Sequence, residues 1–214
     1  MVNQWLYLKS HNETLLCKAP QGAKMKKSYT RKEREAMFKP TYFFGYGSLI
    51  APVGINYRGM SIRYKREDLF PCILKDFERS MCGFFKPRNF YGLLEKKKAY
   101  CNGVVFKIHN WDDYRRLLLS EGATSRYRKE RSYWPVDVTH LIIGWKVPKG
   151  HRVVALVCKQ DKSNLGKVEN SYIRKCYKAA DMWGEDFRDE FLKTGGVAPP
   201  LSKSFRSKKQ SRRN

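Results

Sequence analysis

Short apolar segments separated by polar turns run along most of this chain, and they predict β-strands. Residues 41–50 read Thr-Tyr-Phe-Phe-Gly-Tyr-Gly-Ser-Leu-Ile, an aromatic run that enters a Gly-x-Gly turn. Such a run predicts a strand that feeds a tight loop. Residues 70–81, 100–108, 127–138 and 153–159 predict four further strands.

Helical spacing is found between and after these strands. Asn110 can cap a helix that runs to about Ser120, because Asp112 and Asp113 fall in its first turn and Gly122 follows its end. An amphipathic segment spans residues 169–183, and a shorter helix is predicted over 186–193. Since short loops separate the strands, we expect an α+β fold with a mixed or antiparallel sheet.

The two ends of the chain differ in composition from its middle. A length of 214 residues favours one domain with extensions. We expect residues 1–40 to be a basic arm with a small helix near 31–38, and residues 41–195 to be the folded domain. Residues 196–214 are rich in Pro, Ser and basic side chains, which predicts a tail without stable structure.

Composition and spacing exclude several classes of protein. No apolar run approaches the ~18 residues of a membrane-spanning helix, and the N-terminus lacks a secretory pattern, so we expect no membrane association. The six cysteines form no C-x-x-C pair, which favours free thiols in a reducing compartment, either the cytoplasm or the mitochondrial matrix. The four histidines have no metal-ligand spacing, and no metal site is predicted.

Residues 45–50 begin like a dinucleotide-binding fingerprint but lack its last glycine. Ile50 stands at that position, no βαβ unit follows, and Pro52 and Gly54 argue against a helix start. This excludes NAD binding. The glycine pair still lets backbone N–H groups approach an anion closely. The alternative is a tight turn with no ligand.

The run Phe44-Gly45-Tyr46-Gly47-Ser48-Leu49-Ile50 resembles the signature loop of the γ-glutamylcyclotransferase-like family, and most of all that of its glutathione-degrading, ChaC-like branch. Later segments are similar to the family in the same order: Leu74–Arg79, Gly103–Phe106, Glu121-Gly122 with Tyr127 downstream, Tyr172 with Lys175–Ala180, and Asp186-Phe187. The resemblance covers roughly residues 42–193. It implies a small mixed β-barrel flanked by helices, with no metal or organic cofactor.

The resemblance also implies a reaction. The α-amine of a γ-glutamyl group attacks its own γ-carbonyl, closes a five-membered ring and releases 5-oxoproline together with an amine. Glu121 takes the role of general base. The implied substrate-binding residues are Tyr46, Gly47, Ser48, Leu49, Tyr127 and Tyr172, with loop N–H groups holding a carboxylate or the oxyanion. The alternatives are a solvated helix end for Glu121 and a core position for Tyr172.

The residues around Glu121 depart from the ChaC-like branch. Ser120 precedes the glutamate, where that branch more typically has arginine, and the residues after Glu121 look more like the γ-glutamylamine and γ-glutamyl branches. The leaving group therefore stays open between Cys-Gly, an amino acid and a lysine ε-amine.

The charge of the chain points to a second class of function. Its 44 basic and 20 acidic side chains give +24, of which +12 belongs to residues 42–200. Such a surplus suits a polyanion such as RNA. Aromatic and basic residues also interleave over residues 84–91, as in single-strand binders, although a hairpin with core-facing aromatics is the alternative. The candidate nucleic-acid residues are Lys86, Arg88, Lys203, Arg206, Lys208, Lys209, Arg212 and Arg213.

Two hypotheses follow from the sequence. In the first, the chain is an active γ-glutamyl cyclotransferase whose basic extensions localise it. In the second, it is a structural RNA-binding subunit of a ribonucleoprotein, such as a mitochondrial ribosome or an RNA-processing complex, built on a cyclotransferase fold. Glu121 and the glycine loop favour the enzyme, whereas the net charge, the basic tail and Ser120 favour the subunit.

Overall fold

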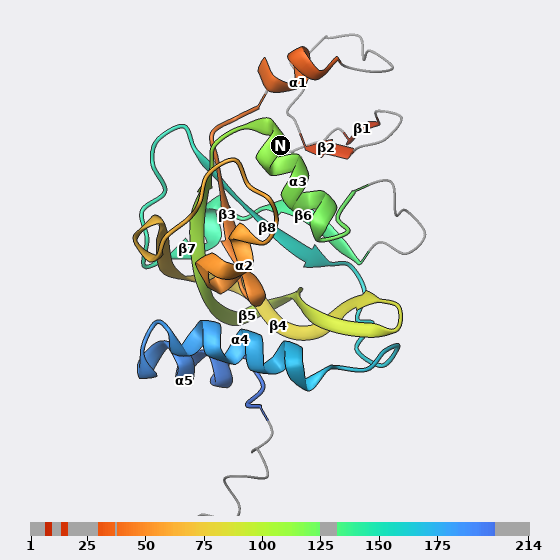
Figure 1. The fold of residues 1–214 in the computed structure, drawn as a ribbon, viewed down its shortest axis with the longest axis vertical. Helices are drawn as coiled ribbons and strands as arrows, with labels where there is room; N and C mark the ends of the chain where they lie inside the picture. Colours follow the sequence, from red (N-terminus) through yellow and green to blue (C-terminus); the bar gives the residue numbers. More distant parts are fainter. Residues whose placement is uncertain (1–6, 10–13, 17–29, 37, 125–131, 200–214) are drawn as a thin grey trace, which may run out of the picture.

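A curled sheet of six strands forms the centre of the molecule (Figure 1). The computed structural model describes residues 7–9, 14–16, 30–36, 38–124 and 132–199. The strand order in the sheet is β6-β8-β3-β5-β4-β7. The strands are β3 (Thr41–Gly45), β4 (Leu69–Phe85), β5 (Arg88–Ile108), β6 (Tyr133–Asp137), β7 (Ile142–Ile143) and β8 (Arg152–Cys158). β3 and β8 run parallel and the other pairs antiparallel, so the sheet is mixed, as predicted.

Strand β3 lies in the middle of the sheet, with both edges paired and all five residues buried. Thr41 pairs with Ile108 of β5 on one side and with Arg152 of β8 on the other. Phe43 and Phe44 are fully buried and join Phe106 in the core. A strand covered on both faces requires a continuous apolar sequence, which is what the aromatic run supplies.

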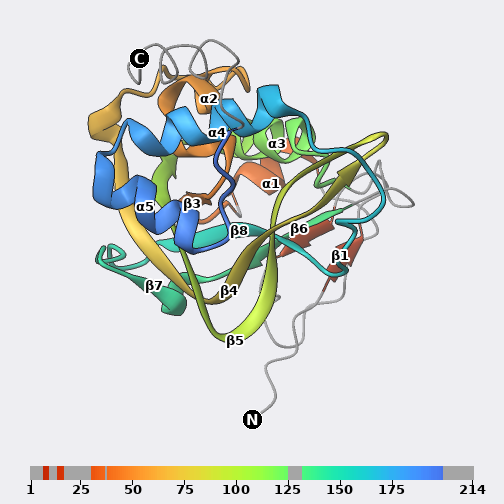
Figure 2. The same cartoon turned by 90° about the horizontal axis from the view of Figure 1, so that it is seen from below.

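Helices α2 (Pro52–Asn56), α3 (Trp111–Ser120), α4 (Asn170–Asp181) and α5 (Glu185–Lys193) flank the sheet. α1 (Arg31–Ala36) lies beyond one end of the sheet (Figure 1). Short 3-10 turns lie at Ser48–Ile50, Arg66–Asp68 and Thr139–Leu141. β1 (Tyr7–Lys9) and β2 (Thr14–Leu16) pair as a separate two-stranded sheet. α4 and α5 lie side by side, and α4 contacts the turn Ser48–Ile50 (Figure 2).

The structure confirms the predicted α+β class. Its sheet curls into a half-barrel that is flanked by helices, and the main predicted elements are present. It also contradicts one local expectation, because a helix does begin at Pro52. Proline is accepted at the first helical position, where its missing N–H would have no partner. Gly54 is needed inside this helix, since a Cβ there would lie 1.8 Å from the carbonyl oxygen of Ser48.

Parts of the predicted arm and tail, and Tyr127, lie outside the described residues. The start of the predicted tail is packed against the domain: Gly196 N–H donates to the Phe191 carbonyl at 2.8 Å, and Val197 N–H donates to the Tyr91 hydroxyl at 2.8 Å. In the part of the chain that the structure describes, no helix is long and apolar enough to cross a membrane.

Candidate active site

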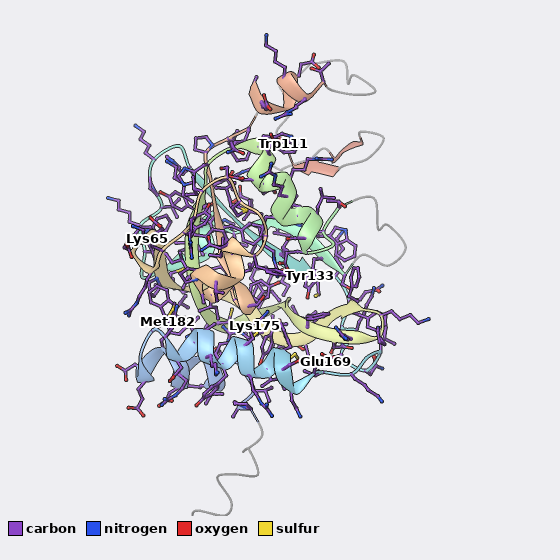
Figure 3. All side chains as sticks on the ribbon, viewed as in Figure 1. Lys65, Trp111, Tyr133, Glu169, Lys175 and Met182 are labelled. Carbon is purple, nitrogen blue, oxygen red and sulfur yellow. The ribbon has the colours of Figure 1, made fainter. Side chains whose placement is uncertain are left out.

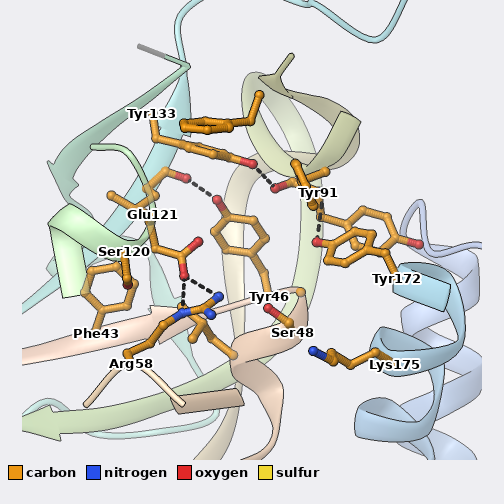
Figure 4. Close-up of a pocket in the computed structure, with 15 residues that line it drawn as sticks. Phe43, Tyr46, Ser48, Arg58, Tyr91, Ser120, Glu121, Tyr133, Tyr172 and Lys175 are labelled. Atoms are coloured by element: carbon orange, nitrogen blue, oxygen red, sulfur yellow. Dashed lines mark hydrogen bonds and ion pairs between the residues drawn. The ribbon is translucent and has the colours of Figure 1, made fainter. Parts of the chain in front are cut away.

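A pocket of about 320 Å³ opens where the loop after β3, the end of α3 and the start of α4 meet (Figure 4). It brings together residues that are far apart in the sequence. The lining residues are Phe43, Tyr46, Gly47, Ser48, Leu49, Arg58, Phe85, Phe90, Tyr91, Ser120, Glu121, Tyr133, Leu156, Tyr172 and Lys175.

The end of α3 places Glu121 at this pocket. Asn110 caps the start of the helix, and its side chain accepts from Asp113 N–H at 2.8 Å. At the other end, Gly122 N–H donates to Leu119 O at 3.1 Å and Ala123 N–H donates to Leu118 O at 2.8 Å. This pair of bonds is a Schellman motif, which needs a left-handed residue after the cap. Gly122 has a φ of +64° and supplies it, so the chain turns sharply just after Glu121.

Arg58 binds the Glu121 carboxylate. Its Nε and Nη2 atoms both lie 2.7 Å from Oε1, and both side chains are 18% exposed. Both contacts fall on the same carboxylate oxygen, while Oε2 has no hydrogen-bond partner among the described residues. One oxygen is therefore held in place, and the other is free to exchange a proton.

Two opposing effects act on the pKa of Glu121. Burial at the pocket wall raises the pKa of this carboxyl, and the charge and hydrogen bond of Arg58 lower it. Burial is the larger effect, so the pKa is raised above its ordinary value. A carboxylate with a raised pKa is a stronger base than an exposed glutamate.

A second set of contacts fixes the segment that carries Arg58 against α3. Asp113 is fully buried and accepts from Ser61 N–H at 2.8 Å and from Ser61 Oγ at 2.5 Å. Arg116 donates to the Gly59 carbonyl at 2.8 Å. The helix that ends in Glu121 thus also holds the loop that brings its arginine partner.

The glycine loop is held from behind by a buried arginine. Arg79 is 3% exposed, and its Nε donates to the Tyr46 carbonyl at 2.8 Å. The same guanidinium donates to the carbonyls of Phe191 and Asn102 and to the Thr194 hydroxyl. Beyond Tyr46, the residues Gly47, Ser48 and Leu49 pass along the pocket. Arg79 therefore links this loop to β5 and to the end of α5.

Four tyrosines form much of the remaining wall. Tyr46 donates to the Leu156 carbonyl at 2.7 Å, and Tyr133 donates to the Tyr91 carbonyl at 2.8 Å. The Tyr172 hydroxyl accepts from Tyr91 N–H at 3.1 Å. Burial raises the pKa values of Tyr46, Tyr133 and Tyr172 well above their ordinary value. These phenols therefore stay neutral near pH 7 and serve to shape the pocket and to form hydrogen bonds.

The structure brings most of the site residues predicted from the sequence to one pocket: Tyr46, Gly47, Ser48, Leu49, Glu121 and Tyr172 all line it. Tyr127 lies outside the described residues. Four further pocket residues carry polar groups and are not among the site residues predicted from the sequence: Arg58, Tyr91, Tyr133 and Lys175. The Tyr91 position could have been suspected from the aromatic run at 84–91, and Lys175 begins a stretch that resembles the family, but no local motif marks Arg58 or Tyr133.

The candidate nucleic-acid residues are only partly covered by the structure. Lys86 and Arg88 are exposed at the turn between β4 and β5, where Arg88 forms an ion pair with Glu169 at 2.6 Å. Within the same segment, Phe85, Phe90 and Tyr91 line the pocket. Lys203, Arg206, Lys208, Lys209, Arg212 and Arg213 fall outside the described residues. Among those that are described, no three or more His, Cys, Asp or Glu side chains gather as metal ligands would.

The architecture matches known structures, although the sequence matches no family model and no curated protein. A structure described as γ-glutamyl cyclotransferase aligns with a TM-score of 0.51 at 13% identity, over 81% of this chain and 99% of the other. The chain has the γ-glutamyl cyclotransferase fold. The uncharacterized protein loc79017 from Homo sapiens aligns with a TM-score of 0.51 at 14% identity, over 81% of this chain and 99% of its own.

The same cyclotransferase fold is found in part of a larger protein. YkqA from Bacillus subtilis aligns with a TM-score of 0.54 at 16% identity, and the alignment covers 75% of this chain. It spans 55% of YkqA, so that protein extends well beyond the shared region. At these identities the likeness establishes the fold alone, because one fold can host unrelated functions.

Proposed function

We propose that this protein is a γ-glutamyl cyclotransferase that releases 5-oxoproline from a γ-glutamyl substrate, with Glu121 as general base. The observation that carries the proposal is the Glu121 carboxylate at the pocket wall, with Arg58 on one oxygen and the other oxygen free. The glycine loop lines the same pocket, and the fold agrees with this assignment.

The reaction needs one proton carrier and a folded substrate. The α-amine nitrogen of the glutamyl group attacks the γ-carbonyl carbon, and Glu121 Oε2 takes a proton from that nitrogen. A C–N bond forms, and the carbonyl oxygen becomes an oxyanion. Glu121 then gives the proton to the leaving nitrogen while the original C–N bond breaks. Since nucleophile and carbonyl belong to one molecule, the pocket chiefly has to hold the bent conformation.

The remaining pocket residues suit the other demands of this reaction. Ser48–Ile50 is a 3-10 turn, whose first N–H groups have no partner within the turn. Backbone donors at Gly47, Ser48 and Leu49 would stabilise the oxyanion or the glutamyl carboxylate. The neutral hydroxyl groups and rings of Tyr46, Tyr133 and Tyr172 would enclose the glutamyl chain.

The direct test is release of 5-oxoproline by the purified protein. Glutathione, γ-glutamyl-alanine and γ-glutamyl-ε-lysine are supplied in parallel to the wild type and to Glu121→Gln, which keeps the shape but cannot take up the proton. We expect kcat/KM to fall by about 10²- to 10⁴-fold in the variant, the usual contribution of a general base.

A matched control separates the base from a general loss of charge. Glu95→Gln removes an exposed carboxylate from β5 that is not part of the pocket, and it should retain full activity. If folded wild-type protein releases no 5-oxoproline from any of the three substrates, or if Glu121→Gln is as active as the wild type, the proposal is wrong.

The basic surface favours a second candidate function, binding of RNA. The paired strands β4 and β5 form a long two-stranded ribbon, here called the β4–β5 ribbon. Lys86, Lys97 and Lys98 are exposed along it, and none of them forms an ion pair with another described residue. Together with the +24 net charge, this ribbon is suited to phosphate contacts. In this function the fold would be a scaffold within a ribonucleoprotein, and the pocket would be retained without being required.

A further inference from the structure

A second cavity adjoins the Glu121 pocket. Its volume is about 230 Å³, and its walls are Arg88, Asn89, Phe90, Glu169, Ser171, Tyr172 and Lys175. Three of these residues, Phe90, Tyr172 and Lys175, also line the Glu121 pocket. The two spaces therefore meet along these side chains, and a ligand held at Glu121 can extend past Tyr172 into this side cavity.

The charges around the two spaces are unequally compensated. Arg58 is paired with Glu121 at 2.7 Å, and Arg88 is paired with Glu169 at 2.6 Å. Lys175 stands between the two spaces and forms no ion pair with another described residue. Its ammonium lies 5.8 Å from the centre of the Tyr57 ring, which is too weak a contact to neutralise it. The junction of the two spaces thus carries one uncompensated positive charge.

The placement of Lys175 explains why the charge is available to a ligand. Lys175 is exposed on α4, and it lies between that helix and α2, while Glu169 lies at the beginning of α4 (Figure 3). In the close-up, the Lys175 amine points across the pocket mouth toward Ser48, on the side opposite Arg58 and Glu121 (Figure 4). A substrate whose glutamyl amine is at Glu121 would direct its other end toward this side.

We propose that the side cavity receives the leaving group and that Lys175 binds its carboxylate. The inference rests on the proposed cyclotransferase function and narrows its substrate class. The preferred substrates would be γ-glutamyl amino acids or γ-glutamyl peptides with a free carboxylate on the leaving group. A γ-glutamylamine with a neutral leaving group would be a poorer substrate, because its leaving group has no carboxylate to bind the ammonium of Lys175.

The first test compares two substrates that differ only in that carboxylate. Release of 5-oxoproline is measured from γ-glutamyl-alanine and from γ-glutamyl-ethylamide, for the wild type and for Lys175→Ala. We expect kcat/KM for γ-glutamyl-alanine to fall about fivefold to tenfold in the variant, as for the loss of a partly exposed charged contact. The value for γ-glutamyl-ethylamide should stay within twofold of the wild type.

The matched control is Lys178→Ala. Lys178 is exposed on the same helix and lines neither cavity, so its removal lowers the net charge equally. It should leave the preference for γ-glutamyl-alanine unchanged. If Lys175→Ala weakens both substrates equally, Lys175 binds the glutamyl carboxylate or acts on the fold, and the leaving-group assignment is wrong.

A binding measurement keeps this result separate from that of the proposed function. Glutaryl-alanine and glutaryl-ethylamide lack the attacking amine and cannot cyclise, and their affinities are measured by calorimetry. Tighter binding of glutaryl-alanine to the wild type, lost in Lys175→Ala, supports the assignment. Equal binding of the two compounds to the wild type overturns it. If the wild type binds glutaryl-alanine selectively but releases no 5-oxoproline from any γ-glutamyl substrate, the cyclotransferase function is refuted and the binding assignment is kept.

Discussion

At the scale of single residues, the pocket depends on a pair that no local pattern reveals. Glu121 stands at the end of a well-marked helix beside a glycine, and the resemblance in the glycine loop directs attention to it. Arg58 lies 63 positions earlier, in a loop of ordinary composition. Its role can be recognised only in the folded structure, in which Asp113 and Arg116 bind that loop to α3. Contacts of this kind arise from tertiary packing, and a single sequence does not encode them as a motif.

This pair leads to a prediction about pH. Arg58 lowers the pKa of Glu121 against the larger effect of burial, so Arg58→Ala should raise that pKa further. The base is active only when deprotonated. The acidic limb of the kcat/KM profile should therefore move to higher pH in Arg58→Ala, and the activity lost at low pH should return as the pH rises. The measurement is a profile of 5-oxoproline release over the acidic range.

Arg63→Ala is the control for that profile, because Arg63 is exposed and does not line the pocket. Its acidic limb should coincide with that of the wild type. If the acidic limb of the kcat/KM profile stays at the same pH in Arg58→Ala, the arginine does not influence the pKa of Glu121.

At the scale of elements, sequence patterns located most strands and helices but missed some of their lengths. The prediction of a strand over 70–81 is confirmed, but β4 continues to Phe85. β5 begins at Arg88, twelve residues before the predicted start at residue 100. The Lys-rich stretch 96–98 and the aromatic–basic stretch 84–91 do not look like buried strands. β4 and β5 pair with each other over most of their length, with irregularities between Lys75 and Phe77 and between Ser80 and Gly83. Residues 96–98 lie opposite the first irregularity, between the pairs Lys75–Tyr100 and Phe77–Glu95, and Lys98 has a φ of +68°.

The hydrogen bonds of Arg79, which join the glycine loop to β5 and α5, lead to a prediction about stability. The Arg79 guanidinium is buried and has no carboxylate partner among the residues that the structure describes, and it donates to Tyr46, Phe191 and Asn102. Arg79→Met would fill a similar volume but leave these acceptors without donors. We expect the free energy of unfolding to fall by about 3 kcal/mol, the order of cost for unsatisfied buried polar groups.

Urea denaturation measures this change, and Lys75→Met is the control. Lys75 is exposed on the same strand, so its replacement should change stability by less than about 0.5 kcal/mol. An Arg79→Met protein as stable as the wild type would show that the carbonyl groups find other partners and that the guanidinium does not hold the loop.

At the scale of the whole molecule, the α+β class followed from the order of the elements. The resemblance implied a small mixed β-barrel flanked by helices, and the structure has a mixed six-stranded sheet that curls into a half-barrel. The sequence did not show which strands are neighbours in the sheet. The parallel pairing of β3 with β8 joins segments separated by more than half of the described domain. Apolar patterning marks both as buried strands but contains nothing that specifies the partner or its direction.

The net charge is also a property of the whole molecule, and it predicts salt-dependent binding of single-stranded RNA. Affinity for a fluorescent oligonucleotide, measured by anisotropy, should fall linearly with salt on logarithmic axes. In the triple variant Lys86→Ala, Lys97→Ala, Lys98→Ala, the slope should be smaller by about 2, because each lost phosphate contact contributes about 0.7. An unchanged slope would exclude the β4–β5 ribbon as the contact surface.

The pairing of β3 also governs when the pocket can exist during synthesis of the chain. Tyr46 forms its hydrogen bond with Leu156, 110 residues later, and Tyr172 and Lys175 are made later still. Contacts between such distant segments form slowly, because a long loop has to close before they are gained. The glycine loop and Glu121 are thus synthesised before the residues that complete the pocket around them. A growing chain acquires its pocket only when α4 has emerged, so partial chains should not consume a substrate that the folded protein can turn over.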